Sequence, residues 1–147
     1  MLVKDTRVIG TLVPGKNAGA VVRDILKHNI QLALKVEKKQ DIWIQMMQDT
    51  TTLKENSMVA LGLFKPTGRS KVPKKKLNMR RKPKTLKYVA PVIDNGTRIR
   101  VAKYVHNGFC FQLDPGSYFV FAGFCVAKER AYMIRVIGEG VTLSTLT

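Results

Sequence analysis

The sequence predicts a mainly β protein: a small antiparallel sandwich or barrel with one short N-terminal α-helix and a long basic loop. Three observations predict it. Apolar residues alternate with polar ones over several short segments, turn-forming residues separate these segments, and residues 65–87 contain 11 basic residues with no sustained period. At 147 residues the chain is expected to form one domain, residues 1–147, with residues 65–87 as an extended basic insert.

The first part of the chain predicts a strand followed by a helix. Residues 2–13 form a β-like segment interrupted by Gly10, and the following residues 14–17 (Pro-Gly-Lys-Asn) are typical of a turn. Asn17 is a suitable helix N-cap. The apolar positions within residues 18–28 fit one face of the helix that would follow.

The period then changes to that of strands. Apolar residues alternate over residues 30–36 and again over residues 42–46, with a plausible turn between them, which predicts a hairpin. A continuous helix over residues 18–39 is the alternative. The compact apolar run at residues 58–64 predicts a further strand.

Beyond the basic insert, short strands alternate with turn-compatible residues, which predicts a meander that closes into a sandwich or barrel. The expected strands are residues 86–93, 97–105, 109–113, 117–127, 131–137 and 141–146. If residues 114–117 close a hairpin, Cys110 lies opposite Phe121. Cys110 and Cys125 are then expected to be reduced thiols in the core. The aromatic residues of this half, such as Phe119 and Phe121, are expected to pack in the core or at a subunit interface.

The net charge is concentrated in the insert. The chain has a formal charge of +16, of which the insert carries +11 and the other residues +5. Such a local surplus repels itself unless it is solvated or matched by a polyanion, so we expect the insert to neutralise nucleic-acid phosphates. The expected ligands are Lys65, Arg69, Lys71, Lys74, Lys75, Lys76, Arg80, Arg81, Lys82, Lys84 and Lys87.

No aromatic residue lies within residues 65–84, so base stacking is not indicated there and binding to the nucleic-acid backbone without sequence specificity is expected. Four other interpretations of the insert remain open. It could be a solvated charged loop, a nuclear-localisation signal, a patch for anionic membranes or a grip on an acidic protein surface.

Signals for catalysis are weak. Residues 10–17 match a phosphate-binding loop except at the last position, where Asn17 stands in place of the hydroxyl that binds magnesium. The two histidines, His28 and His106, form no recognisable metal motif. We therefore expect no catalytic residues, no metal and no cofactor, and we expect that the protein is not an enzyme.

These observations predict a structural protein of a large nucleic-acid-containing assembly. A virion subunit of a virus or phage, located in the virion or the host cytoplasm, is preferred because the body outside the insert is only mildly basic. Its expected partners are nucleic acid and other subunits, including copies of itself. The alternative is a ribosomal or other ribonucleoprotein component that binds RNA, and a nucleotide-binding enzyme using residues 10–17 is a distant one. No apolar run approaches the ~20 residues of a membrane span.

Overall fold

The computed structural model describes residues 4–12, 30–48, 59–78, 83–89, 100–102, 106–124 and 130–147. These residues form ten strands in two antiparallel sheets and contain no helix, so the mainly β prediction is confirmed. The strands are β1 (Lys4–Leu12), β2 (Ile30–Val36), β3 (Gln40–Gln48), β4 (Val59–Pro66), β5 (Leu86–Tyr88), β6 (Arg100–Ala102), β7 (His106–Leu113), β8 (Gly116–Phe124), β9 (Arg130–Gly138) and β10 (Val141–Thr145). The helix expected at residues 18–28 lies outside the described residues.

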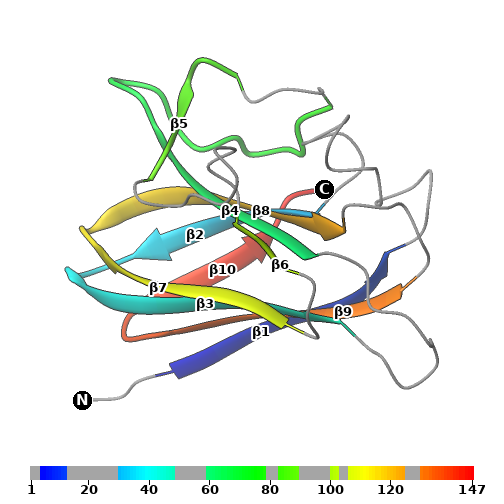
Figure 1. Cartoon of the computed structure of the whole chain (residues 1–147). Coiled ribbons are helices and arrows are strands. Elements are labelled where there is room, and N and C mark those ends of the chain that lie inside the picture. Colours follow the sequence, from blue (N-terminus) through cyan, green and yellow to red (C-terminus); the bar gives the residue numbers. More distant parts are fainter. Residues whose placement is uncertain are drawn as a thin grey trace.

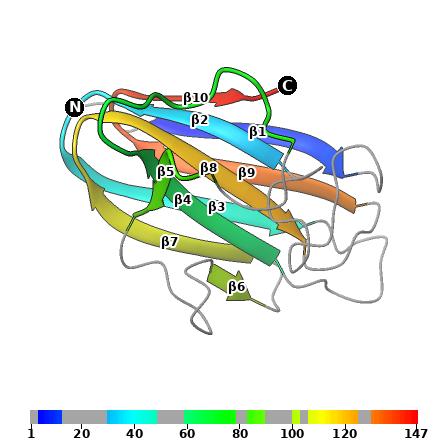
Figure 2. The same cartoon turned by 90° about the horizontal axis from the view of Figure 1, so that it is seen from above.

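The two sheets pack face to face as a sandwich (Figures 1 and 2). The four-stranded sheet has the order β1-β9-β3-β7, and the six-stranded sheet has the order β10-β2-β8-β4-β5, with β6 also paired to β4. The chain changes sheet at every step from β1 to β4 and again from β7 to β10. This alternation between two facing antiparallel sheets is the connectivity of a jelly roll.

The expected strand pairings differ from those observed. The hairpin predicted between residues 30–36 and 42–46 is wrong, because β2 pairs with β8 and β10 while β3 pairs with β7 and β9. The meander is wrong for the same reason. The alternation of a strand fixes which side chains face the core, but it does not fix which strand lies beside it. The alternative helix over residues 18–39 is also wrong across β2.

The corner after β7 is a second difference. It carries the chain from the four-stranded to the six-stranded sheet, so Cys110 pairs with Trp43 of β3 and not with Phe121. Gly116 makes the corner possible with a positive φ of 151°. Cys110 is a free thiol as expected, but it is exposed on the outer face of the sheet and not in the core. Cys125 lies outside the described residues.

The main core lies between the two sheets. All the inward-facing residues of β2 are apolar and belong to this core. β3, β4, β8 and β9 also contribute apolar side chains, because each strand places alternate side chains inward. The fully buried members include Leu32, Ile42, Ile44, Met46, Leu61, Leu63, Val120, Ile134 and Val136. This core fixes the two sheets relative to each other and therefore fixes the outer faces that they present.

β1 runs without interruption through Gly10, where the sequence predicted a break. Gly10 pairs with Tyr132 of β9, and a Cβ atom at Gly10 would lie 2.7 Å from the Tyr132 hydroxyl oxygen. Gly10 is therefore explained by the close approach of this ring. In the described part of the chain, no helix is long and apolar enough to cross a membrane.

Candidate nucleic-acid interface

The outer face of the six-stranded sheet is a second apolar layer. Phe64, Phe119 and Phe121 on this face are fully buried, and the rings of Phe64 and Phe119 meet edge to face with centroids 5.8 Å apart. They are outward-facing because residues 118–122 of β8 are apolar without interruption, so both faces of this strand carry large side chains. The prediction that Phe119 and Phe121 pack in the core is confirmed.

The basic insert covers this layer. Val72 and Leu77 from the insert pack against the phenylalanines, together with Leu86 at the end of the insert and Leu146 after β10. In Figure 1 the insert rises from β4, passes over the outer side of the six-stranded sheet and returns through β5. The described part of the insert is therefore docked on the body through its few apolar residues.

Gln31 of β2 fixes the insert to the sheet with a pair of hydrogen bonds. Its side-chain amide nitrogen donates to the carbonyl oxygen of Leu77 at 2.8 Å, and its side-chain oxygen accepts from the Leu77 backbone N–H at 2.7 Å. Gln31 is fully buried. A buried amide is stable only when its polar atoms are hydrogen-bonded, so the docked backbone satisfies Gln31 and Gln31 holds the backbone.

Backbone hydrogen bonds hold the base and the middle of the insert. The Thr67 N–H donates to the carbonyl of Thr85 at 2.9 Å, which ties the ascending and returning chains together. The Lys76 N–H donates to the carbonyl of Thr147 at 3.1 Å, which ties the insert to the segment after β10. These bonds give the described insert a defined course over the sheet.

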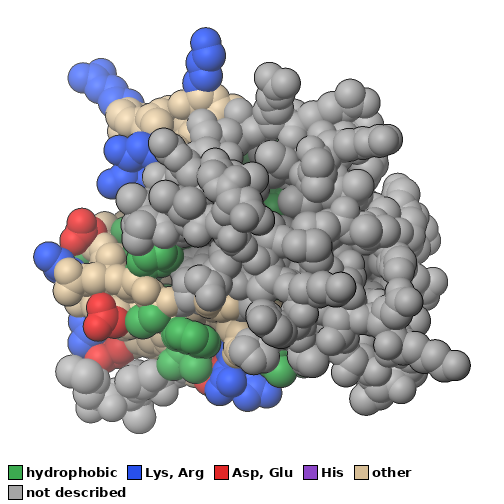
Figure 3. All heavy atoms as spheres, in the orientation of Figure 1, with side chains coloured by type: hydrophobic (Ala, Val, Ile, Leu, Met, Phe, Trp, Pro, Cys, Tyr) green, Lys and Arg blue, Asp and Glu red, His purple; other side chains and the backbone are tan. Residues whose placement is uncertain are grey.

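Most basic side chains of the insert are exposed, whereas its apolar residues Val72 and Leu77 are half-buried against the sheet. Figure 3 shows Lys and Arg side chains projecting from the top of the molecule, where Figure 1 places the insert. The exposed residues are Lys65, Arg69, Lys71, Lys74, Lys75, Lys84 and Lys87. Lys76 is half-buried, and burial lowers the pKa of its ammonium group. Arg80, Arg81 and Lys82 lie outside the described residues.

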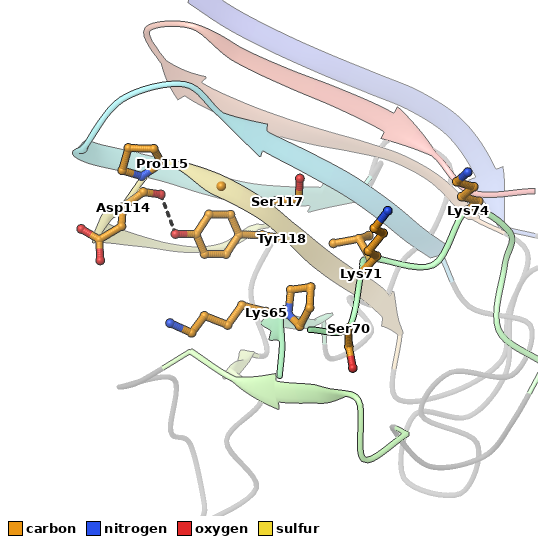
Figure 4. Close-up of a pocket in the computed structure, with 11 residues that line it drawn as sticks. Lys65, Ser70, Lys71, Lys74, Asp114, Pro115, Ser117 and Tyr118 are labelled. Atoms are coloured by element: carbon orange, nitrogen blue, oxygen red, sulfur yellow. Dashed lines mark hydrogen bonds between the residues drawn. The ribbon is translucent and has the colours of Figure 1, made fainter. Parts of the chain in front are cut away.

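Four of these lysines line two neighbouring hollows beside the β7–β8 corner. The larger hollow, of about 610 Å³, is lined by Lys65, Lys71 and Lys74 on one side and by residues 114–118 on the other (Figure 4). The smaller one, of about 260 Å³, is lined by Lys65 and Lys87 and shares Asp114 and Tyr118 with the first. The structure thus brings together basic residues that are up to 22 positions apart in the sequence.

Tyr118 lines both hollows and is hydrogen-bonded to the β7–β8 corner. Its hydroxyl donates to the backbone carbonyl oxygen of Asp114 at 2.6 Å, the contact drawn in Figure 4. Burial raises the pKa of the Tyr118 phenol, and the nearby Asp114 carboxylate raises it further, so the phenol is neutral at physiological pH. The Asp114 carboxylate is largely exposed, and its ion pair with Lys39 is long, at 3.9 Å.

The described residues form neither a phosphate-binding loop nor a metal site from the other candidates in the sequence. Gly10 of the phosphate-loop pattern lies within β1, and the rest of that pattern, from residue 13, falls outside the described residues. Among the described residues, no three His, Cys, Asp or Glu side chains are grouped to hold a metal ion.

No protein-family model matches the chain, and no curated protein matches it. The sequence analysis named the basic residues of this candidate interface but did not predict the contacts that dock the insert on the sheet. The residues that could have indicated this docking are Val72 and Leu77, which are apolar within a basic segment, and Gln31, which is polar within the apolar β2.

Proposed function

We propose that the protein is a non-enzymatic structural subunit of a nucleic-acid-containing assembly, specifically a virus or phage virion, and that its basic insert neutralises nucleic-acid phosphates. The observation that carries the proposal is the contrast in burial between the apolar and the basic residues of the insert. Val72 and Leu77 face the sheet, whereas seven Lys and Arg side chains are exposed on the insert and the strand ends beside it.

This arrangement suits a polyanion. Among the described residues, none of the insert's Lys or Arg side chains forms an ion pair with a carboxylate. Their mutual repulsion is relieved when they contact phosphates, and binding releases the counterions condensed on the nucleic acid. Because hydrogen bonds already fix much of the insert, little chain entropy is lost on binding.

The fold supports a structural role by analogy. Jelly rolls form viral capsid subunits as well as lectin and cupin domains, so the analogy favours the virion without deciding the function. The outer face of the four-stranded sheet carries Ile9, which is 74% exposed, and Trp43, which is 38% exposed. In the proposal this face contributes to contacts with neighbouring copies of the subunit.

The test is binding of the purified protein to double-stranded DNA, single-stranded DNA and structured RNA from about 50 to 400 mM salt. We expect the logarithm of the affinity to fall linearly with the logarithm of the salt concentration. A variant with Gln at Lys74, Lys75, Lys76, Arg80, Arg81 and Lys82 should flatten the slope by about one unit for each phosphate that the insert no longer neutralises.

The control variant carries Gln at Arg7 and Arg135, which lie on the outer face of the four-stranded sheet, away from the insert. It should change the slope much less per charge removed. An unchanged slope in the insert variant, with the fold intact by circular dichroism, would show that the insert is not part of the binding surface. Weak, salt-insensitive binding to all three polymers would overturn the proposal. If the protein does bind, the polymer that it prefers would separate a DNA-containing particle from a ribonucleoprotein.

A further inference from the structure

The two hollows beside the β7–β8 corner contain more positive charge than their surroundings balance. Lys65, Lys71, Lys74 and Lys87 line them, and Asp114 is the one carboxylate among the described lining residues. Figure 4 shows that Lys71 and Lys74 approach from the insert, whereas Lys65 extends beneath Tyr118 toward Asp114. Cations therefore reach the larger hollow from two different elements.

The sheet itself brings two of these lysines together. Lys65 of β4 and Lys87 of β5 are direct cross-strand partners, and both are exposed. Like charges directly opposite each other destabilise a pair of strands, so this pair costs free energy unless an anion lies between them. The smaller hollow, which both lysines line, is where such an anion would be held.

The larger hollow suits more than an isolated phosphate. Its volume of about 610 Å³ lies in the range of sites for small organic ligands. Pro66, Val72 and Pro115 give it apolar walls, and Ser70 and Ser117 add hydroxyl groups. Apolar walls next to ammonium groups match a sugar and base attached to a phosphate. Lysine is also a common phosphate ligand, because its ammonium acts as a point charge.

We infer that these hollows form a site for single-stranded nucleic acid, in which one nucleotide occupies the larger hollow and an adjacent phosphate binds between Lys65 and Lys87. A duplex cannot place a nucleotide in a hollow without flipping it out of the helix, which favours a single strand. The site deepens the proposed function and rests on it: part of the insert is a defined nucleotide site, and the rest neutralises charge diffusely.

The test uses a short fluorescent oligothymidylate and two double variants that remove equal charge from the same insert. Lys71→Ser with Lys74→Ser removes two of the three cations of the larger hollow. Lys75→Ser with Lys84→Ser removes two exposed lysines that line neither hollow. We expect the first pair to weaken binding by about tenfold or more, the loss expected for a charge-assisted hydrogen bond, and the second pair to weaken it by less than about threefold.

A third variant, Ser117→Phe, fills the larger hollow without changing the charge. Ser117 is exposed, so the fold should tolerate this substitution, which unchanged thermal unfolding would verify. We expect it to weaken binding of the oligothymidylate and to leave the salt slope for long duplex DNA unchanged.

Two results would overturn the site. Equal losses in the two double variants would mean that the hollow has no special part in binding, and so would full binding by Ser117→Phe. Either result leaves diffuse neutralisation by the insert standing. If neither the oligothymidylate nor any long polymer binds, the proposed function fails together with the site.

Discussion

The outer face of the six-stranded sheet and that of the four-stranded sheet differ in what covers them. On the first, Phe119 and Phe121 are fully buried beneath the insert. On the second, the Asp5 carboxylate accepts hydrogen bonds from Arg7 and Arg135, and Ile9 is largely exposed. Both faces belong to one sandwich with a single inner core.

The difference follows from the strand sequences. Residues 118–122 of β8 are all apolar, so a β-strand there must have apolar side chains on both faces. In β9, by contrast, Tyr132, Ile134 and Val136 are buried while Arg135 between them is half-exposed. The outward-facing phenylalanines of β8 are covered by a further layer, which the basic insert provides.

The largest expected effect in this comparison is that of Phe121→Ala. Phe121 is fully buried between the sheet and the insert, so truncation leaves a cavity and should lower the free energy of unfolding by about 3–5 kcal/mol. Chemical denaturation measures the loss. The control, Ile9→Ala on the other outer face, should change it by less than about 0.5 kcal/mol. A comparable loss in both variants would contradict the difference between the faces.

A smaller effect is expected for Gln31→Leu, which tests how the insert is held. The substitution keeps the side-chain volume but leaves the Leu77 N–H and carbonyl without their partner, which should cost about 1–3 kcal/mol. Hydrogen exchange of the Leu77 amide should accelerate more than that of amides in the inner sheet. Gln112→Leu, at an exposed position on β7, is the control and should change neither quantity. Unchanged exchange at Leu77 in Gln31→Leu would show that packing alone docks the insert.

The smallest effect is expected on the polar face, for Asp5→Asn. The hydrogen bond from Arg7, with a further contribution from Arg135, holds the pKa of Asp5 below its ordinary value of 3.8. A carboxyl whose pKa is lower in the folded state stabilises the fold above its unfolded pKa, and this contribution is lost as pH falls through the folded pKa. The wild type should therefore exceed the variant slightly in stability near neutral pH, and the difference should vanish in acid. Thermal unfolding of both proteins across this pH range measures it, and a difference that grows in acid would contradict the assignment.

The sequence predicted the strands better than their pairing. The alternation over residues 30–36 located β2 closely, because burial of one face imposes a period of two. The turn-compatible residues on either side of residues 131–137 located β9. Pairing depends on contacts between distant residues, such as Val36 with Val141 and Trp43 with Ile137, which no local pattern encodes. Local turn signals at residues 37–41 and 114–117 therefore suggested hairpins where the chain in fact crosses between sheets.

The candidate interface was predictable in composition and not in geometry. The density of Lys in residues 65–87 indicated a polyanion-binding surface from the sequence alone. The grouping of Lys65 with Lys74 around the β7–β8 corner depends on the docking of Val72 and on the turn at Gly116. These features become visible only once β4, β8 and the insert lie side by side.

The register between β1 and β9 has a consequence for how the protein is made. Lys4 pairs with Gly138, so β1 can pair with β9 only after the 134 residues that follow Lys4 (138 − 4) have been synthesised. Folds built from such distant pairings form slowly, because closing a long loop costs entropy before any stabilising contact is formed. During that interval the apolar strands that lack their partners expose newly made chains at high local concentration to aggregation. Rapid production of many copies would therefore depend on chaperones or on immediate capture by a partner.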